Sequence, residues 1–297
     1  MNKYVITGAT GNTGRRIALG LLSQGHRVRV ISRNAEKAQG LVDRGGEIFE
    51  GDTTDANLLA RAFAGADAAY IMIPMDAGAP DYTAMQVAHG AAIAEALRVG
   101  SVKHAVTLSS VGTHLSEDSG VVLGLRRMEQ MLDSIDGLSV LHLRPTYFME
   151  NTLAMAGLAK QSGIFGSPIR PDIAIPMIAT QDIADAALRR LQALDFSGTS
   201  HLYLLGPRDV TFAEVAEVYG AAIGRPGLPY VQFPYDDARK AMIGMGMGTS
   251  VVDKLIEFVK LLNAGRVHED ARRTEETTTP TTIAEFANTF KAVYERT

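Results

Sequence analysis

Cysteine is absent from this chain of 297 residues. Its absence excludes disulfide bonds, catalysis by a thiol and metal sites with cysteine ligands. The seven histidines form no His-x-x-x-His pair or comparable cluster, and the carboxylates show no paired spacing typical of metal ligands. We therefore expect no bound metal.

Long runs of basic residues and long runs of apolar residues are absent too. The formal net charge is −4 and no long basic run occurs, which argues against binding nucleic acid through a broad electrostatic surface. No uninterrupted apolar stretch reaches the roughly 18 residues of a membrane span. We expect no signal peptide, because the first predicted strand begins at about Tyr4. We expect a cytoplasmic protein, a monomer or homodimer, whose partner is a small-molecule substrate and neither nucleic acid nor membrane.

Strand and helix patterns alternate through the first half of the chain, and apolar residues make up 46% of the whole. The predicted strands after the first are Arg27–Ile31, Glu47–Glu50, Ala68–Ile73, His104–Leu108 and Leu138–Leu143. Helical patterns with short links separate them, which predicts an α/β fold with a doubly wound parallel sheet. Ligands of such sheets bind at the carboxyl ends of the strands.

The first strand leads directly into a glycine-rich turn, with the sequence YVITGATGNTG ending at Gly14. Gly8 permits a sharp turn, Gly11 lets a phosphate approach the backbone, and Gly14 lets the following helix pack close to the strand. The free N–H groups and the positive end of that helix then face a pyrophosphate. This context predicts a dinucleotide site rather than an ordinary strand-to-helix turn. Its residues are Gly8, Thr10, Gly11, Asn12, Thr13 and Gly14.

The second half is less regular. Residues 163–175 are punctuated by glycine and proline and are predicted to be loop or short strands. Later predicted elements are a helix capped at Thr180, a strand at His201–Leu205, a helix opened by the capping box Thr211–Glu214, and a terminal helix capped by Thr282 and Glu285. We expect a dinucleotide-binding domain over residues 1–150, its sheet completed by residues 174–206. Residues 151–173 and 207–297 then form an interwoven, mostly helical substrate or lid region.

The end of the second predicted strand indicates which nicotinamide cofactor is bound. NAD-binding enzymes usually place a carboxylate there, against the ribose 2′-hydroxyl. This chain places Ser32, Arg33 and Asn34 there, and a guanidinium and a hydroxyl would bind a 2′-phosphate. We expect NADP(H), with NAD(H) bound more weakly; a solvated surface role for Arg33 is the alternative. Asp52, with Thr53 beside it, is expected at the adenine, or as a cap of its own loop.

With these pieces in place, the chain resembles the NmrA-like branch of the atypical short-chain dehydrogenases/reductases. The resemblance covers nearly the whole chain and rests on the glycine motif, Gly51-Asp52, Leu108-Ser109-Ser110, Leu143 to Asn151, and Thr278 to Thr281. It implies a Rossmann fold, a cofactor floor at Ile73-Pro74, and a nicotinamide pocket near Ser109, Tyr147, Phe148 and Asn151. Members of this family include NAD(P)H-dependent quinone, azo-dye and triphenylmethane-dye reductases. Others are nucleotide-sensing regulators without evident catalysis.

One departure from the superfamily pattern bears on the chemistry. Typical short-chain dehydrogenases carry Tyr-x-x-x-Lys on the helix after the fifth strand, where the lysine lowers the tyrosine pKa for alcohol–ketone chemistry. Here that helix, which includes Val121–Glu129, has neither tyrosine nor lysine. This argues against an alcohol dehydrogenase and against an epimerase or dehydratase. Tyr147 and His114 become the candidate proton donors; the alternatives are a pocket wall for Tyr147 and a loop position for His114.

Hydride transfer to a conjugated acceptor needs less catalytic machinery, because the acceptor delocalises the incoming charge and positioning supplies much of the catalysis. We therefore expect an NADPH-dependent reductase of quinones, azo compounds or similar acceptors, with no flavin or metal. The alternative is a non-catalytic nucleotide-binding redox sensor that acts through a protein partner. Both explain the glycine turn and the missing Tyr-x-x-x-Lys.

Overall fold

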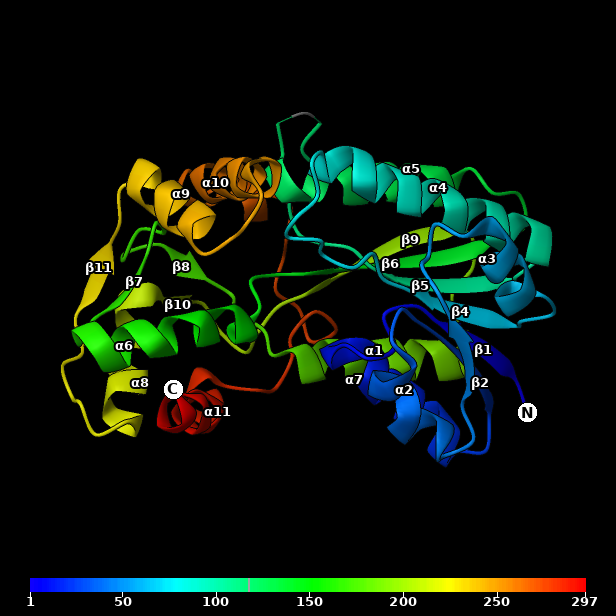
Figure 1. Cartoon of the computed structure of the whole chain (residues 1–297), viewed down its shortest axis with the longest axis horizontal. Coiled ribbons are helices and arrows are strands. Elements are labelled where there is room, and N and C mark those ends of the chain that lie inside the picture. The colour runs from blue at the N-terminus through cyan, green and yellow to red at the C-terminus, as the bar shows by residue number, and fades with distance from the viewer. Residues whose placement is uncertain (117) are drawn as a thin grey trace.

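The computed structural model describes residues 1–116 and 118–297, and within these residues seven strands form the main sheet (Figure 1). Across the sheet they lie in the order β3 (Glu47–Glu50), β2 (Arg27–Ser32), β1 (Lys3–Ile6), β4 (Ala68–Ile71), β5 (His104–Leu108), β6 (Ser139–Pro145) and β9 (Thr199–Leu204). Every neighbouring pair is parallel. The chain runs from β1 to β3 on one side and from β4 to β9 on the other. The predicted α/β fold with a doubly wound parallel sheet is therefore confirmed.

Helices cover both faces of this sheet (Figure 1). One face carries α1 (Asn12–Ser23), α2 (Ala35–Val42) and α7 (Thr180–Ala193), and the other carries α3 (Ala56–Phe63), α4 (Tyr82–Gly100) and α5 (Leu123–Asp133). Because strand side chains alternate between faces, Tyr4 and Ile6 pack with Ile17 of α1, whereas Val5 packs with Leu59 of α3. No helix among the described residues is both long and apolar enough to cross a lipid bilayer.

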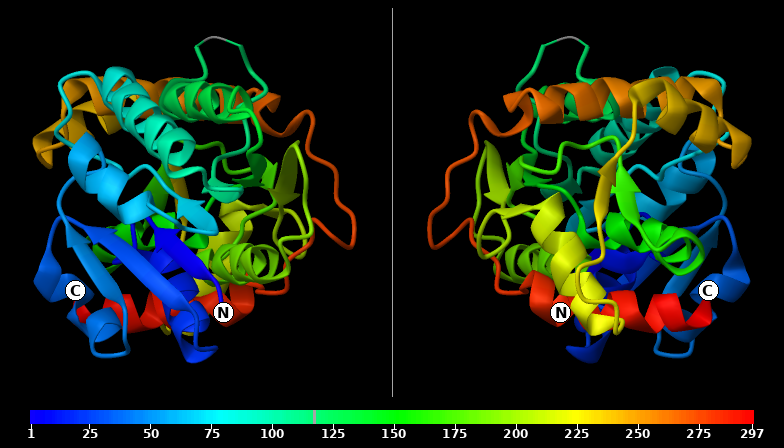
Figure 2. Two further views of the ribbon diagram at one scale, coloured as in Figure 1. Left: turned by 90° about the vertical axis from the view of Figure 1, so that its right-hand side faces the viewer. Right: turned by 90° about the vertical axis from the view of Figure 1, so that its left-hand side faces the viewer.

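A second lobe follows β6 and lies beside the main sheet (Figure 1; Figure 2). Its elements are η2 (Met149–Met155), α6 (Ala156–Ser162), β7 (Phe165–Ser167), β8 (Ala174–Ile175), β10 (Val210–Thr211), α8 (Phe212–Ala222), β11 (Tyr230–Gln232), α9 (Tyr235–Gly244), α10 (Thr249–Asn263), η3 (Arg266–His268) and α11 (Ile283–Arg296). β8 pairs antiparallel with β10, and β7 pairs parallel with β11. A buried cluster that includes Phe165, Phe212, Tyr219 and Phe290 forms the core of this lobe.

The second half of the sequence is interwoven with the main sheet. Of the stretch 174–206, α7 packs on a face of the sheet and β9 extends it, whereas β8 pairs inside the second lobe. After η3 the chain runs back along the end of β9, where Leu205 and Thr278 form a parallel bridge. At the opposite side, the Ser250 hydroxyl of α10 accepts a hydrogen bond of 2.9 Å from the backbone N–H of Tyr82 in α4. The second lobe is therefore attached to the sheet at several points.

The predicted capping boxes differ in outcome. At α11 the box is complete, because the Thr282 hydroxyl accepts from the Glu285 backbone and the Glu285 carboxylate accepts from the Thr282 backbone. At α8 only half of the predicted box forms. The Thr211 hydroxyl accepts from the Glu214 backbone at 3.2 Å, but the Glu214 carboxylate turns to the guanidinium of Arg208. An available cation outcompetes the local backbone N–H for that carboxylate.

Candidate functional site

The turn between β1 and α1 has the tight geometry that its glycines suggest. Gly8 has a φ of +61°, in the left-handed region that favours glycine. A Cβ at Gly14 would lie only 2.4 Å from the carbonyl oxygen of Gly8, so any side chain there would force the helix away from the turn. The backbone N–H of Gly11 donates to the same carbonyl at 3.0 Å. The turn therefore brings the start of α1 directly against the carboxyl end of β1.

The N-terminus of α1 suits an anion. Gly11 is its N-cap and no described side chain caps it, whereas Asn34, Asp55 and Asp81 cap α2, α3 and α4. Uncapped N–H groups at the positive end of a helix dipole favour a phosphate. The Thr13 side chain points inward, where its hydroxyl accepts a bond of 3.0 Å from Tyr70. The backbone, rather than the Thr13 hydroxyl, therefore fits the pyrophosphate of a dinucleotide.

At the end of β2, three neighbouring residues have different roles. The Ser32 hydroxyl donates to the Asn34 carbonyl at 2.9 Å, and the Asn34 side chain accepts from the Lys37 backbone at 2.9 Å as the cap of α2. Arg33 is exposed and forms no ion pair within residues 1–116 and 118–297. Ser32 and Asn34 therefore shape the turn, and Arg33 supplies the guanidinium available to a 2′-phosphate.

Asp52 follows β3 and is held by its own loop. Its Oδ1 accepts hydrogen bonds from the Thr54 backbone at 2.9 Å and from the Thr54 hydroxyl at 2.7 Å. Burial tends to raise the pKa of Asp52, but the bonds from Thr54 and the charges of His89 and Arg33 outweigh it and lower the pKa. Thr53 is buried and bonds His89 Nδ1 at 2.7 Å. Asp52 is thus an ionised loop cap beside Arg33, and Thr53 faces the interior.

The carboxyl ends of β5, β6 and β9 meet in a chain of polar contacts, which we call the β5–β9 network. It consists of Ser109, His114, Glu129, Arg144, Tyr203 and Asp270. The Ser109 hydroxyl donates to Glu129 Oε1 at 2.5 Å, and Arg144 donates to the same carboxylate from Nε at 3.1 Å and from Nη2 at 2.7 Å. Arg144 Nη1 donates to the Tyr203 hydroxyl at 3.1 Å, and that hydroxyl donates to Asp270. Asp270 Oδ1 lies 3.0 Å from Nδ1 of His114.

Burial and charge determine the protonation of this network. Burial tends to lower the pKa of Arg144, but its hydrogen bonds to Glu129 outweigh this and raise the pKa. Burial and the Asp270 carboxylate together raise the pKa of Tyr203 to about 12, although Arg144 opposes them. Arg144 is therefore a cation and Tyr203 a neutral hydroxyl near pH 7.

The sequence singled out only Ser109 and His114 from this network as site residues. Arg144 belongs to the segment that carries the family resemblance but was not predicted as a site residue. Glu129, Tyr203 and Asp270 were not predicted as site residues either. A signal for Glu129 existed. It lies four residues after Leu125 and three before Leu132, so a carboxylate falls on the apolar stripe of α5. Asp270 carries no comparable signal, because it lies in an irregular segment after η3.

Tyr147 packs as a wall of the second lobe. Its ring meets Phe212 edge to face, with the centroids 5.4 Å apart, and burial raises the pKa of its hydroxyl. No described residue hydrogen-bonds that hydroxyl. Phe148 bridges to Ile178, and Asn151 lies exposed in η2. These residues line the junction between the two lobes.

The segment Leu143 to Asn151, which carries the family resemblance most specifically, has structural duties as well. Arg144 forms an ion pair with Glu129. Glu150 caps α7, although it lies 30 positions before Thr180 in the sequence. The Glu150 carboxylate accepts from the backbone of Thr180 at 3.0 Å and from its hydroxyl at 2.6 Å. Thr180 is therefore not the N-cap that the sequence predicted: Ala179 is the N-cap of α7, and Glu150 supplies the missing acceptor.

The floor of the predicted cofactor site follows β4. Ile73 is buried among the side chains of α3, α4 and β4, and Pro74 is half-buried. Met72 packs its methyl group against Gly8, where a Cβ would meet it at 1.9 Å. No cluster of three potential metal ligands is present in the part of the chain that the structure describes.

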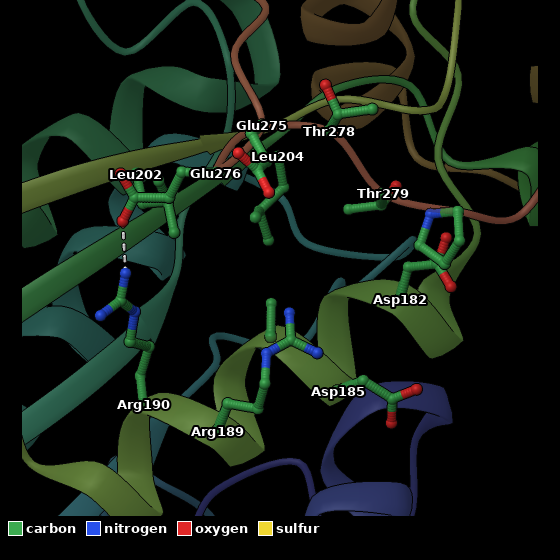
Figure 3. A pocket seen from close by; sticks show the side chains of 12 residues that line it. Asp182, Asp185, Arg189, Arg190, Leu202, Leu204, Glu275, Glu276, Thr278 and Thr279 are labelled. Carbon is green, nitrogen blue, oxygen red and sulfur yellow. Dashed lines mark hydrogen bonds and ion pairs between the residues drawn. The ribbon is translucent and has the colours of Figure 1, made fainter.

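A cavity of about 280 Å³ lies between α7, β9 and the segment 275–280 (Figure 3). Arg189 points into it from α7, while Arg190 pairs with Glu276 and with Asp195. Asp185 in its wall pairs with Arg16 of α1 at 2.5 Å. This cavity contains none of the predicted site residues.

Comparison with known proteins supports a single family. A protein named NAD(P)H azoreductase from Xenophilus azovorans is 29% identical over 260 residues, which cover 86% of each chain. The NADPH-dependent quinone oxidoreductase QOR2 of Escherichia coli, solved with NADPH, has a similar structure, with a TM-score of 0.81 and 23% identity over 96% of this chain and 99% of that one. NmrA, described as a negative transcriptional regulator and solved with NADP, matches with a TM-score of 0.72 and 16% identity over 99% and 93%. The two structural likenesses show a shared fold.

The family model covers almost the whole sequence. The model described as the NmrA-like family matches residues 1–287, which include the main sheet, most of the second lobe and the start of α11. The resemblance read from the glycine motif and the segment Leu143 to Asn151 is therefore confirmed. This chain belongs to the NmrA-like family.

Proposed function

We propose that this protein is an NADPH-dependent reductase that transfers a hydride to a conjugated, electron-poor acceptor such as a quinone or an azo compound. The observation that carries the proposal is the N-terminus of α1 at the glycine turn, which no described side chain caps, with Arg33, which pairs with no described carboxylate, at the end of the neighbouring strand. This pair of features fits a pyrophosphate and a 2′-phosphate. The relatives named azoreductase and quinone oxidoreductase support this choice of substrate class.

In this proposal, different parts of the chain bind the cofactor and the acceptor. Residues 1–150 together with β9 hold the dinucleotide, with Asp52 toward the adenine and Ile73-Pro74 as the floor. Residues 151–173 and 207–297 cover the acceptor. When bound, NADPH supplies the hydride. The acceptor takes it up at one end of its conjugated system, the displaced electron pair moves to a far oxygen or nitrogen, and a proton completes the reduction.

Two side chains are our candidates to assist the proton transfer. His114 is an imidazole whose Nδ1 lies 3.0 Å from the Asp270 carboxylate, and an imidazole is a common general acid. Tyr147 keeps its proton because burial raises its pKa, and it therefore acts as a hydrogen-bond donor to the reduced acceptor. α5 offers neither tyrosine nor lysine, so alcohol–ketone chemistry has no acid–base pair there.

The test is a screen of NADPH oxidation by the purified protein, without added flavin or metal, against quinones, azo dyes, aldehydes and imines. We expect turnover with at least one quinone or azo compound and none with simple aldehydes. Tight NADPH binding with no oxidation across the panel would instead favour a redox sensor, the role suggested by the fold shared with the regulator NmrA.

A further inference from the structure

Glu129 is a buried charge in the middle of α5. It is only 4% exposed, and its two oxygens receive Arg144 and the Ser109 hydroxyl. The Thr113 hydroxyl lies 3.5 Å from the same carboxylate. Its helix faces β5 and β6 close to their carboxyl ends, where dinucleotide ligands bind in this architecture.

Stability alone gives a weak reason for such a charge. A buried ion pair usually stabilises a fold no more than apolar side chains of similar size, because both ions lose their hydration. α5 and β6 are also joined by a second polar contact one helical turn further on, where Asp133 Oδ1 lies 2.9 Å from His142 Nε2. That second pair contacts no predicted site residue. Glu129 is distinguished by its contact with Ser109.

The contact fixes the direction of the only proton on the Ser109 hydroxyl. A serine hydroxyl has one hydrogen to donate and two lone pairs that accept. Its proton goes to Glu129 Oε1 at 2.5 Å, and the Ser109 backbone is held by a bond of 2.8 Å to the Leu143 carbonyl. Arg144 keeps the carboxylate in place, because Nε and Nη2 bind it while Nη1 binds Tyr203. Ser109 can therefore offer a ligand only its lone pairs.

We propose that Glu129 is a positioning residue, which commits the Ser109 proton and makes Ser109 an acceptor for an amide N–H of the bound ligand. In the proposed function, on which this inference rests, the matching donor is the carboxamide group of the nicotinamide ring. Ser109 then orients the ring, and Glu129 acts only through Ser109. The remaining members of the β5–β9 network hold the Arg144 side chain in place, and Arg144 in turn holds the Glu129 carboxylate.

The experiment compares Ser109→Ala, Glu129→Gln and the double variant, with Asp133→Asn as the matched control on the same helix. Three quantities are measured with NADPH as the probe: the fluorescence emission of the bound nicotinamide, the dissociation constant of NADPH, and kcat with the best acceptor. Thermal unfolding of each variant is recorded alongside. Glu129→Asp retains the charge beside Arg144 but withdraws it from Ser109, and it replaces Glu129→Gln if that variant does not fold.

We expect Glu129→Gln to lower kcat about ten- to a hundredfold, the size of effect that a small misplacement of reacting groups produces. The emission of bound NADPH should shift as it does in Ser109→Ala. The dissociation constant should change less than about threefold, because the phosphate contacts lie elsewhere. In the Ser109→Ala background, Glu129→Gln should cause no further loss. Asp133→Asn should behave as the wild type in emission and kcat.

Additive losses in the double variant, or equal effects of Asp133→Asn and Glu129→Gln, would overturn the inference and leave Glu129 a structural residue. If the wild type binds NADPH but reduces no acceptor, the proposed reductase fails while the emission arm still tests the role of Glu129. If NADPH does not bind at all, both proposals fail.

Discussion

Asp270 Oδ1 lies 3.0 Å from Nδ1 of His114, so the segment that follows η3 faces the loop that follows β5. The backbone carbonyl of His114 is also held, at 3.3 Å, by Arg126 of α5. Asp270 receives the Tyr203 hydroxyl as well, which ties the carboxylate to Arg144. His268, His201 and Tyr203 are titratable groups near this pair, and Arg144 contacts Tyr203. The second lobe therefore supplies the carboxylate that lies beside His114, the candidate proton donor.

His114→Asn should reduce kcat about 10²- to 10⁴-fold if the imidazole is the general acid, and Asp270→Asn should cause a smaller loss. NADPH affinity should be nearly unchanged in both variants, because neither residue lies near the glycine turn. Steady-state kinetics with a quinone or azo acceptor checks this. Asp209→Asn is the control, since Asp209 pairs with Arg273 in the same C-terminal segment. Full activity of His114→Asn would remove His114 from the mechanism.

Tyr147→Phe should reduce turnover by about three- to tenfold, the worth of one hydrogen bond to the reduced acceptor, and leave NADPH affinity unchanged. The edge-to-face contact with Phe212 does not need the hydroxyl, so the fold should tolerate the change. Paired measurements of kcat and of NADPH binding decide the matter. An unchanged kcat would make Tyr147 a wall residue only.

Arg33→Asp should weaken NADPH binding strongly and NADH binding much less. A charge-assisted hydrogen bond contributes about 1.5–3 kcal/mol, roughly ten- to a hundredfold in affinity, and the exposure of Arg33 places the effect at the lower end. Arg27→Asp is the control, because Arg27 is exposed at the opposite end of the same strand. Titration of both cofactors into the three proteins tests the assignment, and added salt should narrow the preference for NADPH. Equal losses for the two cofactors would refute a 2′-phosphate contact.

Acid should destabilise the fold partly through His268. Burial lowers the pKa of His268 to about 4, and its Nε2 bonds the Thr146 hydroxyl at 2.7 Å. Between an unfolded pKa of about 6.5 and the folded value, the unfolded chain binds more protons, so the free energy of unfolding falls as the pH falls, by up to about 3 kcal/mol. His268→Gln should flatten this dependence in denaturant titrations from pH 7 to pH 4. The same slope in both proteins would show that other groups cause it.

Local patterns in the sequence predicted the Rossmann half well. The strand before Gly8 and the alternation of strands and helices could be predicted because they depend on residue type and on the spacing of apolar side chains. Both can be read from a short stretch of sequence. The complete capping box at Thr282 is equally local. The predicted N-cap at Thr180 was wrong, because the group that accepts from the Thr180 backbone is the side chain of Glu150, 30 positions earlier. Only half of the predicted capping box at Thr211 forms, because the Glu214 carboxylate binds Arg208 instead of the backbone.

The sequence by itself determined the fold class, the glycine turn and the absence of acidic residues at the end of β2, since each depends on residue type at short spacing. Only the tertiary structure decided which polar groups meet. Ser109, Glu129 and Arg144 come from the end of β5, from α5 and from β6, and Asp270 meets His114 across 156 positions of sequence. Hydrogen bonds and ion pairs require atoms about 3 Å apart, and only strand register and helix docking fix positions that closely.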